Sequence, residues 1–196
     1  RQRQMCIRDS VILAVGHSAR DTFKMLFEKS CVPMEPKPFS VGARIEHRAE
    51  TIDRAQYGDF AGDPALGAAD YKLNVHLENG RGVYTFCMCP GGEVVAAASE
   101  EGLLCVNGMS RHARAGANAN AALLVEVRPD DLPGDDSLEG VAFQRQLERD
   151  AYLLGRGLTA DDAEGADISS ESGGAPMPPY TAPAQTVGDF LAHTAG

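Results

Sequence analysis

The stretch Gly82-Val-Tyr-Thr-Phe-Cys-Met-Cys-Pro-Gly-Gly-Glu-Val-Val95 decides how the rest of this chain is arranged. Its first half is an apolar run typical of a strand, and regular alternation places Cys87 and Cys89 on one face of it. Gly91 and Gly92 then allow a turn whose backbone can come close to a ligand. The stretch indicates chemistry at a strand end. The alternative is that two small side chains pack in a core and the glycines only close a hairpin.

Further strands are expected on both sides of this turn. Apolar and polar residues alternate before it, and Asn79-Gly80 is a strong signal for a hairpin with a two-residue loop. Short apolar runs separated by turn residues follow it. The spacing predicts an antiparallel meander of four consecutive strands, at residues 71–77, 83–88, 93–99 and 103–108.

The segment upstream predicts a strand, a turn and a helix. Residues 11–15 form a continuous aliphatic run typical of a strand buried on both faces of a parallel sheet. Asp21 is a good N-cap for the helix that follows. A helix N-terminus after a strand can receive an anion or the edge of a cofactor, although Gly-x-Gly-x-x-Gly occurs nowhere. The candidate cofactor-binding residues here, which are otherwise turn and cap residues, are Gly16, His17, Ser18 and Arg20.

Four more elements follow from periodicity. Residues 39–46 alternate strictly and predict a half-buried strand, residues 49–57 predict a short helix, and residues 123–127 predict a last strand. Residues 140–155 predict an amphipathic helix. Its expected apolar face consists of Phe143, Leu147, Ala151 and Leu154.

Residues 107–120, between the meander and the last strand, combine cations and amides with little side-chain bulk. Such a loop can hold a phosphate, a carboxylate or a flavin carbonyl through charge-assisted hydrogen bonds. An ordinary exposed loop has a similar composition. The candidate residues for a substrate or an anion are Arg111, His112, Arg114, Asn118 and Asn120.

Composition and charge narrow the classes of partner. Hydrophobic residues make up 43% of the chain and charged residues 23%, as in an ordinary globular protein, and no apolar run has membrane-spanning length. The net charge of −10 argues against nucleic acid or an anionic membrane as partner. Five irregularly spaced cysteines indicate reduced cytoplasmic thiols and no metal site. A small-molecule substrate remains the expected partner.

The two ends of the chain differ from its middle. Residues 1–10 show neither the helical nor the strand periodicity of apolar residues. They resemble the translated sequencing-adapter sequence that is fused to truncated metagenomic reading frames. Residues 156–186 are rich in Asp, Glu, Ser, Gly and Pro, which predicts a flexible acidic surface loop. Residues 187–196 begin another apolar element. We therefore expect both ends of the natural chain to be truncated.

Four motifs together point to a known family. In chain order they are Ala14-Val-Gly-His-Ser-Ala-Arg-Asp-Thr-Phe23, Pro38-Phe-Ser-Val-Gly-Ala-Arg-Ile-Glu-His47, Phe86-Cys-Met-Cys-Pro-Gly-Gly92, and Asn107-Gly-Met-Ser110 with Asn118-Ala-Asn120. They resemble the uncharacterised FAD-dependent dehydrogenase family, predicted NAD(P)-utilising flavoprotein oxidoreductases. The resemblance runs over residues 11–192 and is weakest across the acidic loop.

The resemblance implies a truncated two-domain flavoprotein of the α/β plus antiparallel β class. Residues 11–38 would be the last strand-helix unit of a Rossmann-like FAD-binding domain, and residues 39–155 a β-rich second domain that covers the flavin. It also implies hydride transfer through FAD, with NAD(P) as a possible second cofactor. The family's two Gly-rich cofactor segments lie outside this chain, so we expect the isolated chain to hold FAD poorly.

Two other functions compete with this interpretation. A non-catalytic β-rich module could bind anions through Arg111, His112 and Arg114, but the buried strand at residues 11–15 would need a parallel partner. A thiol redox protein could use Cys87 and Cys89, but the Cys-x-Cys spacing on a strand strains a disulfide.

Overall fold

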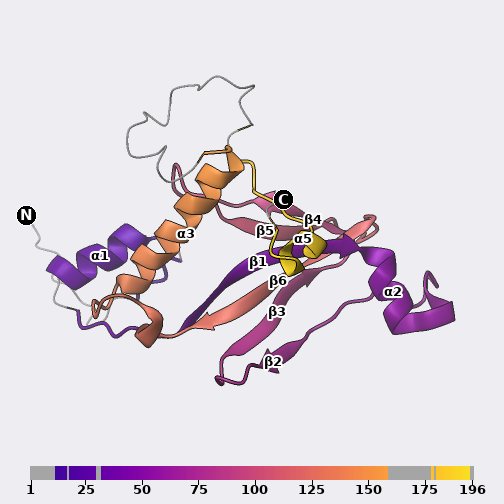
Figure 1. Cartoon of the computed structure of the whole chain (residues 1–196), viewed down its shortest axis with the longest axis horizontal. Coiled ribbons are helices and arrows are strands. Elements are labelled where there is room, and N and C mark those ends of the chain that lie inside the picture. Colours follow the sequence, from indigo (N-terminus) through magenta and orange to yellow (C-terminus); the bar gives the residue numbers. More distant parts are fainter. Residues whose placement is uncertain (1–11, 17, 30–31, 159–177, 179, 195–196) are drawn as a thin grey trace, which may run out of the picture. The chain divides into compact units, whose positions relative to one another are not determined.

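The computed structural model describes residues 12–16, 18–29, 32–158, 178 and 180–194. The chain divides into two compact units, Arg1–Met34 and Glu35–Gly196. Figure 1 shows the whole chain with its elements labelled. The predicted acidic loop falls mostly on residues 159–177, which lie outside the described residues.

The described part of the first unit contains one helix, α1 (Arg20–Lys29), where a helix was predicted. Asp21 is its second residue and not its N-cap, because the amide of Phe23 already donates to the carbonyl of Ala19 at 3.2 Å. The predicted strand at residues 11–15 is wrong for its described part. Residues 12–15 are exposed and form no strand, with Ile12 91% exposed. A parallel strand needs a hydrogen-bonded neighbour, and the described residues offer it none.

The second unit is built on a four-stranded antiparallel sheet of order β1-β6-β3-β2, seen side by side in Figure 1. A two-stranded sheet of β4 and β5 accompanies it. The strands are β1 (Phe39–Arg48), β2 (Asn74–His76), β3 (Gly82–Cys89), β4 (Gly92–Ala96), β5 (Val106–Ser110) and β6 (Asn118–Val127). The helices are α2 (Ala49–Tyr57), η1 (Gly58–Phe60), η2 (Pro129–Asp131), α3 (Glu139–Gly155) and α5 (Val187–Leu191).

The hairpin predicted at Asn79-Gly80 joins β2 to β3. Its loop has three residues and not two, because the amide of Leu77 donates to the carbonyl of Arg81 at 2.9 Å. Gly80 adopts a φ of 74°, which a glycine supplies at the end of such a loop. The hairpin is confirmed, and β2 is shorter than the predicted strand at residues 71–77.

The predicted four-strand meander is wrong. The strand β3 pairs with β6 and not with β4, while β4 pairs with β5 in the second sheet. The chain therefore changes sheets at the Pro-Gly-Gly turn. The physical reason lies in β6, which has ten residues instead of the five predicted, and whose buried alanines let neighbouring strands and loops pack closely on it.

A β-bulge interrupts β3 just before this turn. Phe86 pairs with Ala122 and Cys89 pairs with Asn120, so three steps along β3 match two along β6. Cys87 is the residue with the unusual backbone, at a φ of 48°. Regular alternation does not hold here, and the premise that placed Cys87 and Cys89 on one face is wrong.

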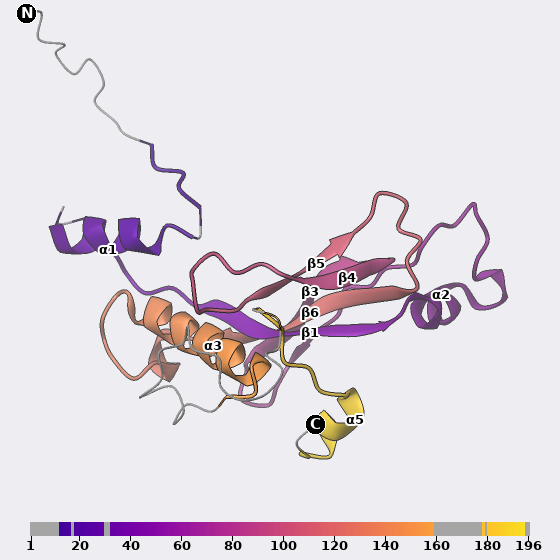
Figure 2. The same cartoon turned by 90° about the horizontal axis from the view of Figure 1, so that it is seen from above.

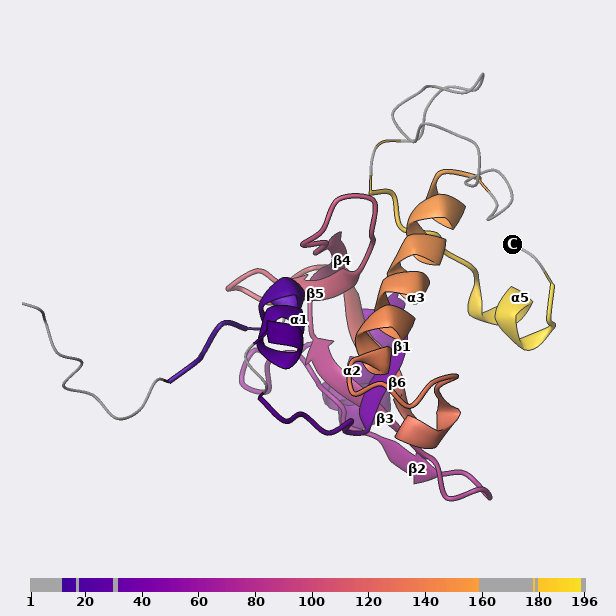
Figure 3. The same cartoon turned by 90° about the vertical axis from the view of Figure 1, so that its left-hand side faces the viewer.

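The four-stranded sheet carries different neighbours on its two faces. The β4–β5 sheet lies on one side and α3 on the other (Figure 2). Gly108 of β5 sits directly over Arg44 and Asn120. On the other side Phe143 of α3 contacts Phe39 at the start of β1, with ring centroids 6.2 Å apart. Figure 3 shows α3 beside β1.

Helix α3 is confirmed, but its buried face is rotated from the predicted one. Tyr152, Leu153 and Gly155 are buried, whereas Leu147 and Leu154 are 41% and 62% exposed. Backbone packing explains the rotation, because a Cβ at Gly155 would overlap the carbonyl oxygen of Thr181.

None of the helices that the structure describes is long and apolar enough to cross a membrane.

Candidate functional site

The Pro-Gly-Gly turn and the predicted anion loop lie against each other. Gly91 is buried at a φ of 57°, and a Cβ there would overlap the carbonyl oxygen of Arg114. A Cβ at Gly116 would overlap the carbonyl oxygen of Gly91. The hydroxyl of Ser110 adds a hydrogen bond to the carbonyl of Pro90 at 2.9 Å. The two segments therefore touch backbone to backbone, with no cleft at the contact.

This contact tests whether the turn fits a flavin. Gly91 and Gly92 would make a cradle only if the space above them were open, but protein backbone fills it. The turn therefore does not fit a cofactor cradle. Its glycines instead let β4 and the loop of residues 111–117 approach closely.

The side chains of that loop suit an anionic group better. Arg111 has an 88% exposed side chain whose nearest carboxylate, on Glu93, is 3.8 Å away. Arg114 holds a φ of 49°, and its amide donates to the carbonyl of Arg111 at 2.9 Å. His112 is exposed between them. Two guanidinium groups and an imidazole on a braced loop match the chemistry of phosphate or carboxylate binding.

The two asparagines predicted for this loop belong to β6 instead. Asn118 donates through Nδ2 to Oε1 of Glu46 at 2.7 Å, which ties β6 to β1. Asn120 is completely buried. Its Oδ1 accepts a hydrogen bond from Nε of Arg44 at 2.7 Å. Asn120 is therefore sequestered between the two sheets, away from the exposed cations of the loop.

Arg44 is the centre of a polar network that the sequence did not reveal. Its Nη2 donates to the carbonyl of Cys87 at 2.7 Å and lies 3.6 Å from Sγ of Cys89. A Cβ at Gly108 would overlap both Arg44 and Asn120, so β5 lies directly on the pair. Arg44 alternates with apolar neighbours, a pattern typical of a solvent-facing side chain. The position of β5 over Arg44 instead leaves it half-buried.

Nδ2 of Asn120 has no hydrogen-bond partner among the described residues. The orientation of the amide is fixed, because Arg44 has only donors and must face the oxygen. An orphaned buried donor costs roughly 1 to 3 kcal/mol, which the two hydrogen bonds of Arg44 offset.

Cys87 and Cys89 are free thiols beside this network. Cys87 is exposed, and Cys89 is half-buried with its Sγ donating to the carbonyl of Cys87 at 3.4 Å. No group of three metal-ligating side chains gathers in the described ranges.

A second polar pair lies farther along β1. In the neutral imidazole of His47, Nδ1 donates to the carbonyl of Arg48 at 3.2 Å, so Nε2 accepts from the hydroxyl of Tyr71 at 2.9 Å. Burial raises the pKa of Tyr71, and the nearby charge of Arg44 partly opposes that effect. This phenol stays protonated and anchors the segment before β2 to β1.

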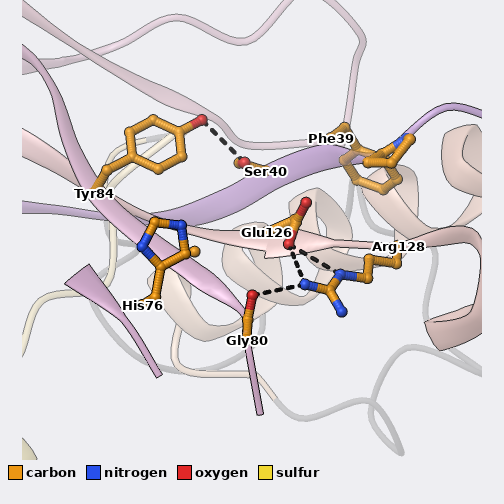
Figure 4. Close-up of a pocket in the computed structure, with 9 residues that line it drawn as sticks. Phe39, Ser40, His76, Gly80, Tyr84, Glu126 and Arg128 are labelled. Atoms are coloured by element: carbon orange, nitrogen blue, oxygen red, sulfur yellow. Dashed lines mark hydrogen bonds and ion pairs between the residues drawn. The ribbon is translucent and has the colours of Figure 1, made fainter. Parts of the chain in front are cut away.

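A shallow groove of about 380 Å³ lies on the same sheet face as Arg44, near the start of β1 (Figure 4). The Tyr84 hydroxyl donates to Oγ of Ser40 at 3.0 Å, and Arg128 donates to the Gly80 carbonyl at 2.8 Å. Arg128 also pairs with Glu126 at 2.9 Å. Most of the polar groups of the groove therefore form hydrogen bonds or ion pairs with one another. Sequence reasoning missed this groove because it depends on the β1–β6 and β3–β6 pairings. Its main lining residues are Phe39, Ser40, His76, Tyr84, Glu126 and Arg128.

A bidentate ion pair holds the edge of this groove. Arg81 donates to the two carboxylate oxygens of Asp131 at 2.6 and 2.7 Å. The Arg81 hydrogen bonds hold the pKa of Asp131 well below its usual range, and the amide of Arg128 adds to this effect. The pair joins the start of β3 to η2 and fixes the hairpin at the end of β6.

The other predicted cofactor residues lie in the first unit. Gly16 has a φ of 76°, and a Cβ there would meet nothing within 4 Å. Ser18 lies in the turn and Arg20 begins α1. His17 lies outside the described residues. Whether these residues contact a cofactor stays a prediction.

Comparison with known proteins gives the chain its family. Residues 38–196 match the family described as "FAD-dependent protein, C-terminal domain-like". A protein of Clostridium beijerinckii named "Uncharacterized protein" is 48% identical over 184 residues, which are 93% of this chain and 30% of that protein. The chain thus spans about a third of the length of this relative. Because the match covers most of its residues, the chain belongs to the family of FAD-dependent protein C-terminal domains.

Proposed function

We propose that this chain is part of a longer FAD-dependent oxidoreductase, a dehydrogenase in which the β-rich unit binds the substrate. The observation that carries the proposal is the family match over residues 38–196. FAD, when bound in the longer protein, supplies hydride transfer, with NAD(P)H as a candidate partner. What this chain contributes is orientation of the substrate.

The residues proposed for that task are Arg111, His112 and Arg114. The backbones of Gly91 and Gly116 are in close contact, which fixes the position of the loop that carries these three cationic side chains. They would hold an anionic group of the substrate or of a nucleotide by charge-assisted hydrogen bonds. The predicted roles of Gly16, Ser18 and Arg20 toward the cofactor belong to the same proposal.

The full-length Clostridium beijerinckii relative is expected to purify with bound FAD, whereas the 196-residue chain is not. The space above Gly91 and Gly92 is filled by other backbone of this chain, so the turn provides no binding site for a pyrophosphate. Visible absorbance spectra of both proteins, with the released flavin identified by chromatography, make the measurement. A colourless relative that cannot be reconstituted with FAD would refute the proposal.

Alanine at the relative's residues that align with Arg111 and His112 is expected to weaken substrate binding by roughly 1.5 to 3 kcal/mol, the range for hydrogen bonds to charged groups. Bound flavin should stay in place, because the loop is proposed to contact substrate. The measurement is KM and kcat with flavin content recorded in parallel. Alanine at the residue aligned with Arg54, which forms only an exposed pair with Glu50, is the control. Full activity of the double variant would make the loop ordinary surface.

A further inference from the structure

One face of the four-stranded sheet is apolar across all four strands. The register places Val41 opposite Val125, Val125 opposite Val83, and Val83 opposite Val75. Directly paired residues of an antiparallel sheet point to the same side, so the four valines form one continuous row. We call this row, together with Leu73, Leu77 and Leu123, the valine face.

Helix α3 packs on this face at Phe39 through Phe143, but the described chain leaves much of the rest of the face open to solvent. Leu73 is 63% exposed, Val75 55%, Leu77 45% and Leu123 43%. Single exposed apolar side chains are ordinary, but a contiguous apolar patch on a sheet marks an interaction surface. The opposite face has a different character, since it carries the polar groove and the Arg44 network and is partly covered by β4 and β5 (Figure 2).

We propose that the valine face is the surface on which the remaining part of the longer flavoprotein packs. The Clostridium beijerinckii protein, at 48% identity, extends over a length of which this chain matches only 30%. Most of such a protein is therefore chain that can supply an apolar partner to this face. An antiparallel sheet with one polar and one apolar face buries the apolar one.

A second copy of this chain is a poorer occupant. Each copy carries a net charge of −10, and thirteen acidic against three basic side chains follow position 128. Pairing two such chains brings like charges together, which opposes association. The inference concerns packing alone and holds whether or not the longer protein binds FAD.

The test places a lysine on each side of β2. Val75 and Asn74 are adjacent, and both are exposed in this chain, but only Val75 belongs to the valine face. Val75→Lys and Asn74→Lys are made in the 196-residue chain, and lysine is placed at the aligned positions of the full-length relative. The unfolding temperature of each protein is followed by circular dichroism. Size-exclusion chromatography reports the oligomeric state of the unmodified chain.

In the full-length protein, lysine at the position of Val75 is expected to lower the unfolding temperature by roughly 5 °C or more, because its charge would be buried at the contact. The Asn74 counterpart should change it by less than about 2 °C, as an exposed surface substitution does. In the 196-residue chain both lysines should be tolerated equally. An equal loss from the two lysines in the full-length protein, or no loss from either, overturns the proposal.

Hydroxyl-radical labelling provides a reading that does not depend on a variant folding. The peptides that carry Leu73, Val75 and Leu123 should label several-fold less in the full-length relative than in this chain. Equal labelling overturns the proposal. A discrete dimer of the 196-residue chain that Val75→Lys disperses would assign the face to a second copy and also overturn it.

Discussion

The Gly91→Ala chain is expected to lose about 3 kcal/mol of its free energy of unfolding, as the sum of two costs. The first is the φ of 57°, which an L-residue adopts only with strain. The second is the overlap of the new Cβ with the carbonyl oxygen of Arg114, which cannot rotate away because it is backbone. Either the turn or the loop of residues 111–117 must move.

Gly80→Ala separates these two costs. Gly80 has a φ of 74° but meets nothing within 4 Å of a built Cβ, so only the backbone strain of about 1 kcal/mol applies. Urea unfolding of both variants, followed by circular dichroism, gives the comparison. If Gly91→Ala costs no more than Gly80→Ala, the contact between the turn and the loop contributes nothing to the stability of the protein.

The Arg44→Met chain is expected to lose about 3 kcal/mol, because the buried Oδ1 of Asn120 loses its partner and no polar replacement is supplied. Arg44 donates to Asn120 Oδ1 and to the carbonyl of Cys87, each at 2.7 Å. After the substitution the Asn120 side chain would be buried with neither its oxygen nor its nitrogen satisfied. The free energy of unfolding in urea measures the loss.

Two further variants serve as controls for Arg44→Met. Arg54→Met removes an exposed arginine whose pair with Glu50, at 2.7 Å, lies on the surface of α2, and should cost about 0.5 kcal/mol or less. The double variant Arg44→Met, Asn120→Leu should lose less than the sum of its single variants, since apolar replacement of both partners leaves fewer unsatisfied groups. A loss from Arg44→Met no larger than that from Arg54→Met would contradict the interpretation.

Elements with strong local signals could be predicted from the sequence. The helix at residues 49–57 and the alternating strand that starts at Phe39 have the expected positions, and Asn79-Gly80 makes the expected hairpin. Each depends on periodicity or turn chemistry within a few residues. What failed was the choice of strand partners. Local spacing favoured β4 as the neighbour of β3, whereas the structure gives that edge to β6, some 35 residues farther along the chain.

Dependence on local spacing also limited what the sequence could predict about the candidate site. From local spacing the sequence predicted consecutive strands at residues 93–99 and 103–108, and the β4–β5 hairpin that they form brings the Pro-Gly-Gly turn and the loop after β5 together. The sequence could not indicate that backbone would fill the space at Gly91, nor that β5 would cover Arg44. Those facts depend on how two sheets stack, which no periodicity within one strand encodes.

The pairing of β1 with β6 has a consequence for how such a domain could be gained or lost. Phe39, the first residue of β1, lies directly opposite Val127, the last residue of β6. Paired residues of an antiparallel ladder have Cα atoms about 5 Å apart. The 89-residue segment from Phe39 to Val127 therefore leaves the rest of the chain and returns at one point in space. A host protein could acquire or lose this whole segment at a single position, without separating the parts on either side of it.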